Sequence, residues 1–142
     1  MIVSKDLEIC LPLGSGFTDT DNLDGVAGKI SADGKIIEPV TSATDMPDGI
    51  ISQPQGREQF GQRATATLVL WGAPYKIRLN LGSKPTGVAV KTELAMQADG
   101  TFAKAAGTAG EITVGFALEP VVSAVSDQRV TAKLYADPKV HS

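Results

Sequence analysis

The sequence predicts an all-β protein that folds as a single compact β-barrel or β-sandwich. Turn-forming residues recur about every 8–12 residues between short apolar runs, a spacing typical of such folds. No window keeps a helical spacing of apolar residues over several turns. In addition, residues 49–68 align without a gap with residues 115–134, at an offset of 66 along the chain. This repeat predicts an internal duplication with two related halves.

A glycine, a proline break and a Gln-Arg pair carry the repeat. Gly49 aligns with Gly115, Pro54 with Pro120, Gln62-Arg63 with Gln128-Arg129, Thr65-Ala66 with Thr131-Ala132, and Leu68 with Leu134. Two copies are too few for a solenoid, so we expect two related halves of one barrel or sandwich.

Residues 1–25 are predicted to be an extended N-terminal arm and a linker, ahead of a β-domain over residues 26–142. Residues 1–11 are apolar and β-prone, whereas residues 12–25 are rich in Gly and Asp and form a long loop. An arm that folded back onto the body would not need such a loop. We therefore expect its apolar residues to become buried only against a neighbouring chain; these are Ile2, Val3, Leu7, Ile9 and Leu11.

The rest of the chain reads as strands separated by turns. Residues 28–31 and 35–40 flank Asp33-Gly34, a hairpin signal, and Asp48-Gly49 and Asp99-Gly100 predict two more turns of that kind. Between Tyr75 and Leu81 apolar and polar residues alternate strictly, as in a half-buried strand. Further strands are expected over residues 62–71, 88–96, 100–104, 111–118 and 129–135.

Composition excludes several classes of function. With a net charge of −3, the 142-residue chain has no electrostatic basis for binding DNA or RNA, and no polybasic patch for an anionic membrane. The N-terminus lacks the features of a signal peptide and no run is long enough to span a membrane, so synthesis in a cytoplasm is expected. The single cysteine, Cys10, lies in an apolar run and is expected to be a small buried hydrophobe.

The residues that catalysts need are scarce. The only histidine is His141, next to the C-terminus, where a general base or metal ligand would not be held rigidly. Gly14-Ser15-Gly16 lacks the third glycine of a phosphate loop. Asp19, Asp21 and Asp24 do not complete a calcium-binding pattern, so a solvated linker is the favoured reading. We expect no cofactor, no metal and no catalytic residues.

Two further groups of residues have both a structural and a functional interpretation. Arg63 and Arg129 begin paired strands and either bind a ligand in each half or, as we favour, form local ion pairs with residues such as Asp127. Scattered carboxylates could serve a glycosidase only if two of them converged; these are Glu38, Glu93, Glu111 and Glu119. Trp71 and Tyr75 flank a turn, and we expect them to pack at a subunit contact.

Several segments together resemble the capsid cement, or head decoration, proteins of tailed bacteriophages. The order and spacing agree over about residues 40–135. The segments that carry the resemblance are Thr41-Ser42-Ala43-Thr44-Asp45-Met46-Pro47-Asp48-Gly49-Ile50-Ile51, the strand Ala64–Trp71, the Asp99-Gly100 turn, the stretch Ala103–Gly110, and Val114-Gly115-Phe116-Ala117-Leu118-Glu119 followed by Val130-Thr131-Ala132-Lys133-Leu134. The N-terminal part before this region is longer and more polar than in a minimal member.

The resemblance implies a non-enzymatic virion protein that binds the outer surface of an assembled capsid. Its partners would be the major capsid protein and further copies of itself, as a homotrimer that clamps neighbouring capsomers. Related proteins use an N-terminal arm to add a strand to the shell, which residues 2–11 could do through main-chain hydrogen bonds. The alternative is a β-sandwich module that binds carbohydrate on a host surface, which would need exposed aromatic platforms; an enzyme is the least favoured class.

Overall fold

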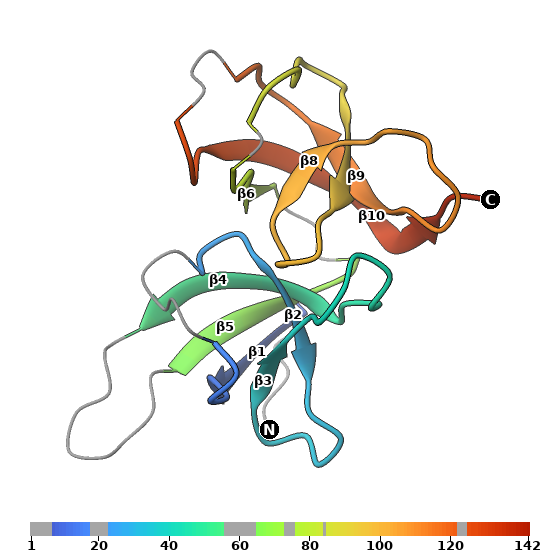
Figure 1. The fold of residues 1–142 in the computed structure, drawn as a ribbon. Coiled ribbons are helices and arrows are strands. Elements are labelled where there is room, and N and C mark those ends of the chain that lie inside the picture. The colour runs from blue at the N-terminus through green and yellow to red at the C-terminus, as the bar shows by residue number, and fades with distance from the viewer. Residues whose placement is uncertain (1–6, 18–22, 56–64, 73–75, 84, 122–124) are drawn as a thin grey trace.

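The structure, a computed structural model, describes residues 7–17, 23–55, 65–72, 76–83, 85–121 and 125–142. These residues form ten strands and no helix, so the predicted all-β class is confirmed (Figure 1). The strands are β1 (Glu8–Pro12), β2 (Ala27–Ile30), β3 (Ile37–Pro39), β4 (Gly49–Gln55), β5 (Thr65–Leu70), β6 (Ile77–Asn80), β7 (Glu93–Met96), β8 (Phe102–Lys104), β9 (Ile112–Ala117) and β10 (Arg129–Val140).

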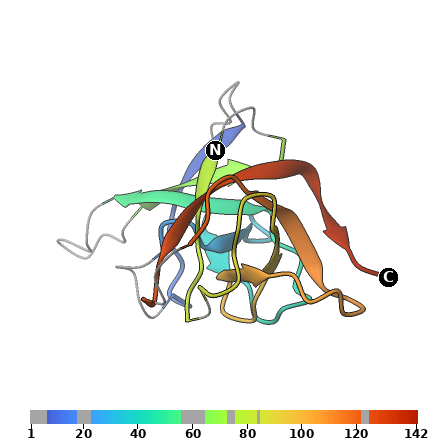
Figure 2. The same ribbon diagram turned by 90° about the horizontal axis from the view of Figure 1, so that it is seen from above.

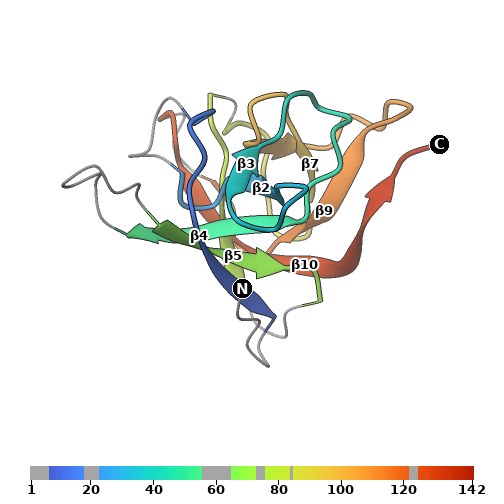
Figure 3. The same cartoon turned by 90° about the horizontal axis from the view of Figure 1, so that it is seen from below.

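The ten strands form two antiparallel sheets with the same topology. The first sheet has the order β1-β5-β4-β2-β3, and the second has the order β6-β10-β9-β7-β8. Each strand of the second sheet therefore occupies the place of the strand five earlier in the first. The two curled sheets lie one above the other as layers (Figure 1), and β1, β5 and β4 run side by side in the lower one (Figure 3). This shared order supports the predicted duplication; we call β1–β5 the first half and β6–β10 the second half.

Main-chain hydrogen bonds repeat at the offset seen in the sequence. The N–H of Gly25 donates to Ile51 O at 2.7 Å, and at the offset of 66 the N–H of Lys91 donates to Ala117 O, also at 2.7 Å. Gly25 has φ 87° and Lys91 has φ 71°, so both copies turn through the left-handed region before β2 or β7. A lysine in this conformation is uncommon. The backbone geometry has thus been kept where the side chain has changed.

The turns between β2 and β3 and between β7 and β8 are a second repeated pair. Asp33-Gly34 and Asp99-Gly100 are related by the same offset of 66, and both glycines have positive φ. The Asp33 carboxylate accepts the N–H of Lys35 at 3.1 Å, and the Asp99 carboxylate accepts the N–H of Thr101 at 3.0 Å. Both predicted turns are confirmed. Asp48-Gly49 is not such a turn, because Gly49 is the first residue of β4 and has no positive φ.

The gap-free alignment fails in the last strand of each half. Gly49 pairs with Leu70, whereas its counterpart Gly115 pairs with Leu134. Leu70 and Leu134 are related by an offset of 64 rather than 66, so β10 is shifted by two positions relative to β5. A shift of two keeps every side chain on its face of the sheet. Gln62-Arg63 lies outside the described residues, and β10 runs on beyond the match, bending at an irregularity between Leu134 and Lys139 (Figure 2).

The two halves stack with different faces in contact. Each sheet has two faces, and we call inner the face that carries Leu68 in the first half and Ala132 in the second half, and outer the opposite face. The inner face of the first sheet carries Ile9, Leu11 and Leu68 in a core of its own. Its outer face carries Ala27, Ile50 and Val69, which join the inner-face residues of the second sheet, such as Leu79 and Phe102, in one larger core. The outer face of the first half is therefore docked on the inner face of the second half.

The predicted separate arm is wrong for Ile9 and Leu11. These residues lie in β1, which pairs with β5, and their side chains are only 1% and 6% exposed within their own chain. Leu7 is half-buried and packs against the larger core. An alternating apolar strand can complete its own sheet as readily as a neighbour's, and here it forms one of the two edge strands of the first sheet. Ile2 and Val3 lie outside the described residues.

The described parts of the segment predicted to be a tether, residues 12–17 and 23–25, pack against the first half. Leu13 bridges to Ile37 of β3, the N–H of Gly14 donates to Ile37 O at 2.8 Å, and Leu23 is buried in the core of the first half. The expected boundary at residue 25 thus falls between two strands of one sheet. Residues 8–17 and 23–25 belong to the body.

Candidate functional site

The carboxylates considered for catalysis do not come together as a pair in the described residues. Glu93 accepts the hydroxyl of Tyr135 at 2.6 Å. Glu111 accepts the N–H groups of Ala106 and Gly107, and Glu119 accepts the N–H of Thr131. Glu111 therefore holds a local turn, whereas Glu93 and Glu119 link residues that are farther apart in the sequence. Glu38 lies apart from them in β3.

The other chemistry-bearing residues have structural surroundings as well. In the part of the chain that the structure describes, no three His, Cys, Asp or Glu side chains are close enough to hold a metal ion together. Asp19 and Asp21 lie outside that part. The main chain of His141 is held in place, since its N–H donates to Glu111 O and its carbonyl accepts the N–H of Gly110. The expectation of a loose tail at His141 is therefore wrong.

The prediction that Cys10 is a buried hydrophobe is wrong, and Arg129 has a different ion-pair partner from the one expected. Cys10 is exposed, because it points to the outer face of an edge strand, with its Sγ 3.4 Å from Thr67 Oγ1. Arg129 makes local contacts as favoured, but its ion pair is with the Asp24 carboxylate at 3.6 Å; from Asp127 it contacts only the carbonyl oxygen. Its Nε also donates to Asp24 O at 2.9 Å, which ties β10 to the segment before β2. Arg63 lies outside the described residues.

Trp71 is held by its own chain. Its indole Nε1 donates to Pro47 O at 3.0 Å, and the half-buried ring packs against the larger core. Tyr75 lies outside the described residues. The subunit contact expected at Trp71 and Tyr75 stays a prediction, and only the part of Trp71 that its own chain leaves uncovered could contribute to it.

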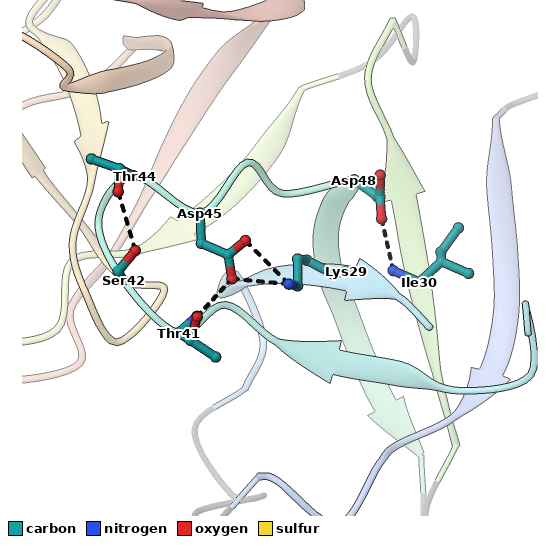
Figure 4. A network of polar contacts seen from close by, with 7 residues as sticks. All are labelled: Lys29, Ile30, Thr41, Ser42, Thr44, Asp45 and Asp48. Carbon is teal, nitrogen blue, oxygen red and sulfur yellow. Dashed lines mark hydrogen bonds and ion pairs between the residues drawn. The ribbon is translucent and has the colours of Figure 1, made fainter. Parts of the chain in front are cut away.

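The connection between β3 and β4, which opens the segment resembling cement proteins, is an ordered loop on the surface (Figure 4). Asp45 lies at its centre and accepts the N–H of Thr41 at 2.9 Å and the Thr41 hydroxyl at 3.1 Å. Lys29, on β2, forms an ion pair with the same carboxylate at 3.0 Å. Asp48 then accepts the N–H of Ile30 at 2.8 Å. These bonds fix the loop against β2.

Replacing Asp45 by alanine is expected to destabilise the protein by about 1–3 kcal/mol, because the N–H of Thr41 and Lys29 lose a charged partner. The Thr41 N–H bond and then Lys29 lower the pKa of Asp45 below its ordinary 3.8. The contribution should therefore be complete above pH 3.8 and disappear as the pH falls through the lowered folded-state pKa. Urea unfolding of both proteins over a pH series tests this. Thr44→Ala, in the same loop, should have little effect; equal losses for both variants would contradict the role of Asp45.

The outer face of the second sheet carries a row of three side chains across adjacent strands. Glu93 on β7 lies opposite Phe116 on β9, and Phe116 lies opposite Lys133 on β10. Directly opposed residues point to the same face, so the row runs acidic, aromatic, basic. Glu93 and Lys133 are exposed and Phe116 is half-buried.

Tyr135 flanks this row and fixes one of its charges. Its ring centroid lies 6.4 Å from that of Phe116, and Lys139 Nζ lies 4.2 Å from the Tyr135 ring. Partial burial, together with the hydrogen bond to Glu93, raises the pKa of Tyr135 to about 12. The hydroxyl therefore remains a donor to Glu93 at neutral pH. We call Glu93, Phe116, Lys133 and Tyr135 the aromatic row.

The aromatic row is not evident from the sequence alone. In the sequence, Glu93 is one of several scattered carboxylates, and Phe116 is part of the segment that resembles cement proteins. The offset of 66 assigns Glu93 to Ala27 and Phe116 to Ile50, which marks a charge where the first copy has alanine. Lys133 corresponds to Val69 only after the register of β10 is known.

A groove of about 360 Å³ lies between residues of the two halves. Its lining residues are Glu8, Asp24, Ser52, Thr67, Lys76, Ile77 and Arg78. These described lining residues bring charges of both signs together, and there is no aromatic ring among them.

Comparisons with known proteins do not place the chain in a family. No protein-family model matches the sequence, and the curated proteins include no significant relative of it. Within the described residues there is also no helix of the length and apolar character required to cross a membrane.

Proposed function

We propose that this chain is a structural protein of a tailed-bacteriophage virion that binds the outer surface of the assembled capsid and bridges capsomers. Three observations support the proposal: the resemblance of residues 40–135 to cement proteins, a body in which polar groups serve structure, and the position of β1 at a sheet edge. Three of the carboxylates considered for catalysis, Glu93, Glu111 and Glu119, each accept a hydrogen bond from a donor of the same chain. The function proposed is non-enzymatic, without a cofactor, nucleic acid or membrane as partner.

The observation that carries the proposal is the position of β1 at the edge of the first sheet. The N–H of Leu70 donates to Leu7 O at 2.8 Å, and in an antiparallel pair this fixes which residues of β1 bond to β5. The main-chain groups of alternate residues, Leu7, Ile9 and Leu11, are directed at β5. The main-chain N–H and carbonyl groups of Cys10 therefore point away from β5, toward the outer edge of the sheet. A strand from the shell could add to this edge.

The equivalent edge in the second half is already covered. There the N–H of Asn80, on β6, donates to Gly25 O at 3.0 Å, and a Cβ at Gly25 would lie only 2.6 Å from Asn80 N. The first half has Pro12 at the position of Asn80, so that donor is missing from β1. Among the described residues, only the edge of β6 has such a contact, and we take the edge of β1 as the one that receives the capsid strand.

The residues that precede β1 complete the proposed anchor. Ile2 and Val3 would fill apolar pockets of the shell, with burial worth up to about 1.5–3 kcal/mol for each side chain. Ile9 and Leu11 are not part of the anchor, because their own chain buries them. A homotrimer is part of the proposal, since several linked weak contacts bind much more tightly than one.

The test is co-sedimentation with capsids assembled from the major capsid protein of the same phage. The full chain should sediment with them, and the double variant Ile2→Ser, Val3→Ser should bind at least about tenfold more weakly, as lost apolar burial implies. Val140→Ser is the matched control, because Val140 is 59% exposed at the other end of the chain. Both variants should keep the melting temperature of the full chain.

Failure of the full chain to sediment with capsids would contradict the proposal. Equal binding by the double variant would leave the function intact but remove Ile2 and Val3 from the anchor. Retention on a glycan array would favour the alternative of a carbohydrate-binding module. Phe116 and Tyr135 do not form a flat platform for that alternative, because Lys139 lies over the Tyr135 ring and the two rings are tilted by 51°.

A further inference from the structure

The aromatic row has a buried counterpart in the first half. Val69, Ile50 and Ala27 are aligned across β5, β4 and β2, as Lys133, Phe116 and Glu93 are aligned across β10, β9 and β7. The first three are at most 1% exposed, because they form the surface by which the first half docks on the second. The same position in the repeat is thus a docking surface in the first half and an exposed face in the second half.

The second half has kept apolar side chains at part of this surface. Phe116 replaces Ile50, and Tyr135 replaces Trp71 at the offset of 64 that relates β10 to β5. On either side of Phe116 the small and apolar residues have become opposite charges, Glu93 and Lys133. A face that meets only water would not need the ring at its centre, since half-exposed aromatic groups are typical of protein interfaces.

A second copy cannot continue the stacking of the two halves by placing the inner face of its first half on the aromatic row. That inner face is already closed by Leu13 and Leu23 of its own chain. Glu93 and Lys133 would also be buried there without an opposite charge facing them, which is costly. The occupant must therefore offer a charge opposite each of them and an apolar centre.

We propose that the aromatic row is a dimer contact, and that its partner is the same row of a second copy. A two-fold axis parallel to β9 and passing over Phe116 reverses the order of the row. Glu93 then faces Lys133 of the partner copy, Lys133 faces Glu93, and Phe116 packs on Phe116. The sequence of charges, acidic, aromatic, basic, is its own complement under this operation, which is what an isologous interface requires.

The neighbouring groups agree with this arrangement. Tyr135 holds Glu93 by its hydroxyl and so keeps the carboxylate on the face, and Lys139 packs on the Tyr135 ring at the margin of the row. The contact does not depend on the proposed capsid function. If copies also form trimers, this contact would join neighbouring trimers in pairs.

Charge reversal tests the contact by analytical ultracentrifugation of the full chain. The native protein should form dimers at concentrations of about 100 µM, a weak interaction. Glu93→Lys and Lys133→Glu should each weaken association at least tenfold, because each places like charges opposite one another. The double variant Glu93→Lys, Lys133→Glu should restore association. Tyr135→Phe removes only the hydroxyl that bonds Glu93 and keeps both charges, so it measures the effect of that hydrogen bond on association. Circular dichroism of each variant checks that it is folded.

A cross-linking experiment gives an independent reading. In a Cys10→Ser background, Phe116→Cys should be joined rapidly between copies by a short thiol-reactive linker, because packed sheets are about 10 Å apart. Lys104→Cys, exposed on β8 away from the row, is the control. The proposal is overturned if the native protein stays monomeric, if charge reversal leaves association unchanged, if the double variant is not restored, or if positions 116 and 104 cross-link equally slowly.

Discussion

Replacing Ile9 and Leu11 together by alanine is expected to unfold most of the protein at room temperature. Each side chain is almost fully buried in the core of the first half, and each substitution should cost about 2–5 kcal/mol. A domain of this size has a total stability of only about 5–15 kcal/mol. The pair should therefore remove a large part of it, whereas a detachable arm would tolerate both changes.

Urea unfolding followed by circular dichroism measures this effect. Cys10→Ala is the matched control, because Cys10 lies between the two residues on the same strand and is exposed. It should change the free energy of unfolding by no more than about 0.5 kcal/mol. If the Ile9 and Leu11 double variant unfolds like the native protein, β1 is not part of the core.

Gly49→Ala and Gly115→Ala are each expected to destabilise the protein by about 3 kcal/mol or more. A Cβ at Gly49 would lie 2.3 Å from Val69 O, and one at Gly115 would lie 2.2 Å from Lys133 O. Both oxygens belong to the main chain of the paired strand, so relief requires the strands to separate and lose hydrogen bonds. The two glycines occupy the same position in the two halves.

Gly34→Ala is the control for this pair. Its φ is +74° but nothing lies within 4 Å of the added Cβ, so it should cost only about 1 kcal/mol for the left-handed backbone. Thermal unfolding of the three variants ranks them. A tolerated alanine at one of Gly49 and Gly115 but not at the other would show that the two strand pairs are not equivalent.

Local sequence signals predicted the fold class and much of the duplication. Asp33-Gly34 and Asp99-Gly100 are turns because an Asp side chain can bond the N–H two residues on while glycine takes positive φ, and both properties are local. The two turns share the offset of 66 with Gly49 and Gly115. The repeat therefore extends to the strand pairs β2–β3 and β7–β8.

Long-range pairing could not be predicted in the same way. Ile9 and Leu11 alternate with their neighbours equally well in an edge strand of the same sheet and in a strand donated to another chain, so the pattern left the partner undetermined. The shorter offset of β10 relative to β5 likewise appears only in the pairing of Gly115 with Leu134. Local alternation is insensitive to a shift of two positions.

The aromatic row escaped prediction for a related reason. Glu93, Phe116 and Lys133 come from three strands that are separated in the sequence, and each alone is an ordinary residue of a strand. They become a site only when the sheet order brings β7, β9 and β10 together and the first half shows what that position can do.

The amount and location of this chain in purified phage heads test the proposed function most directly. Quantitative mass spectrometry of intact particles, before and after brief surface proteolysis, measures how much of this chain they carry and whether it lies outside. We expect a fixed ratio of this chain to the major capsid protein, with a loss on proteolysis that leaves the shell protein intact. Particles that lack the chain, or that hold it only where protease cannot reach, would contradict a capsid-surface role.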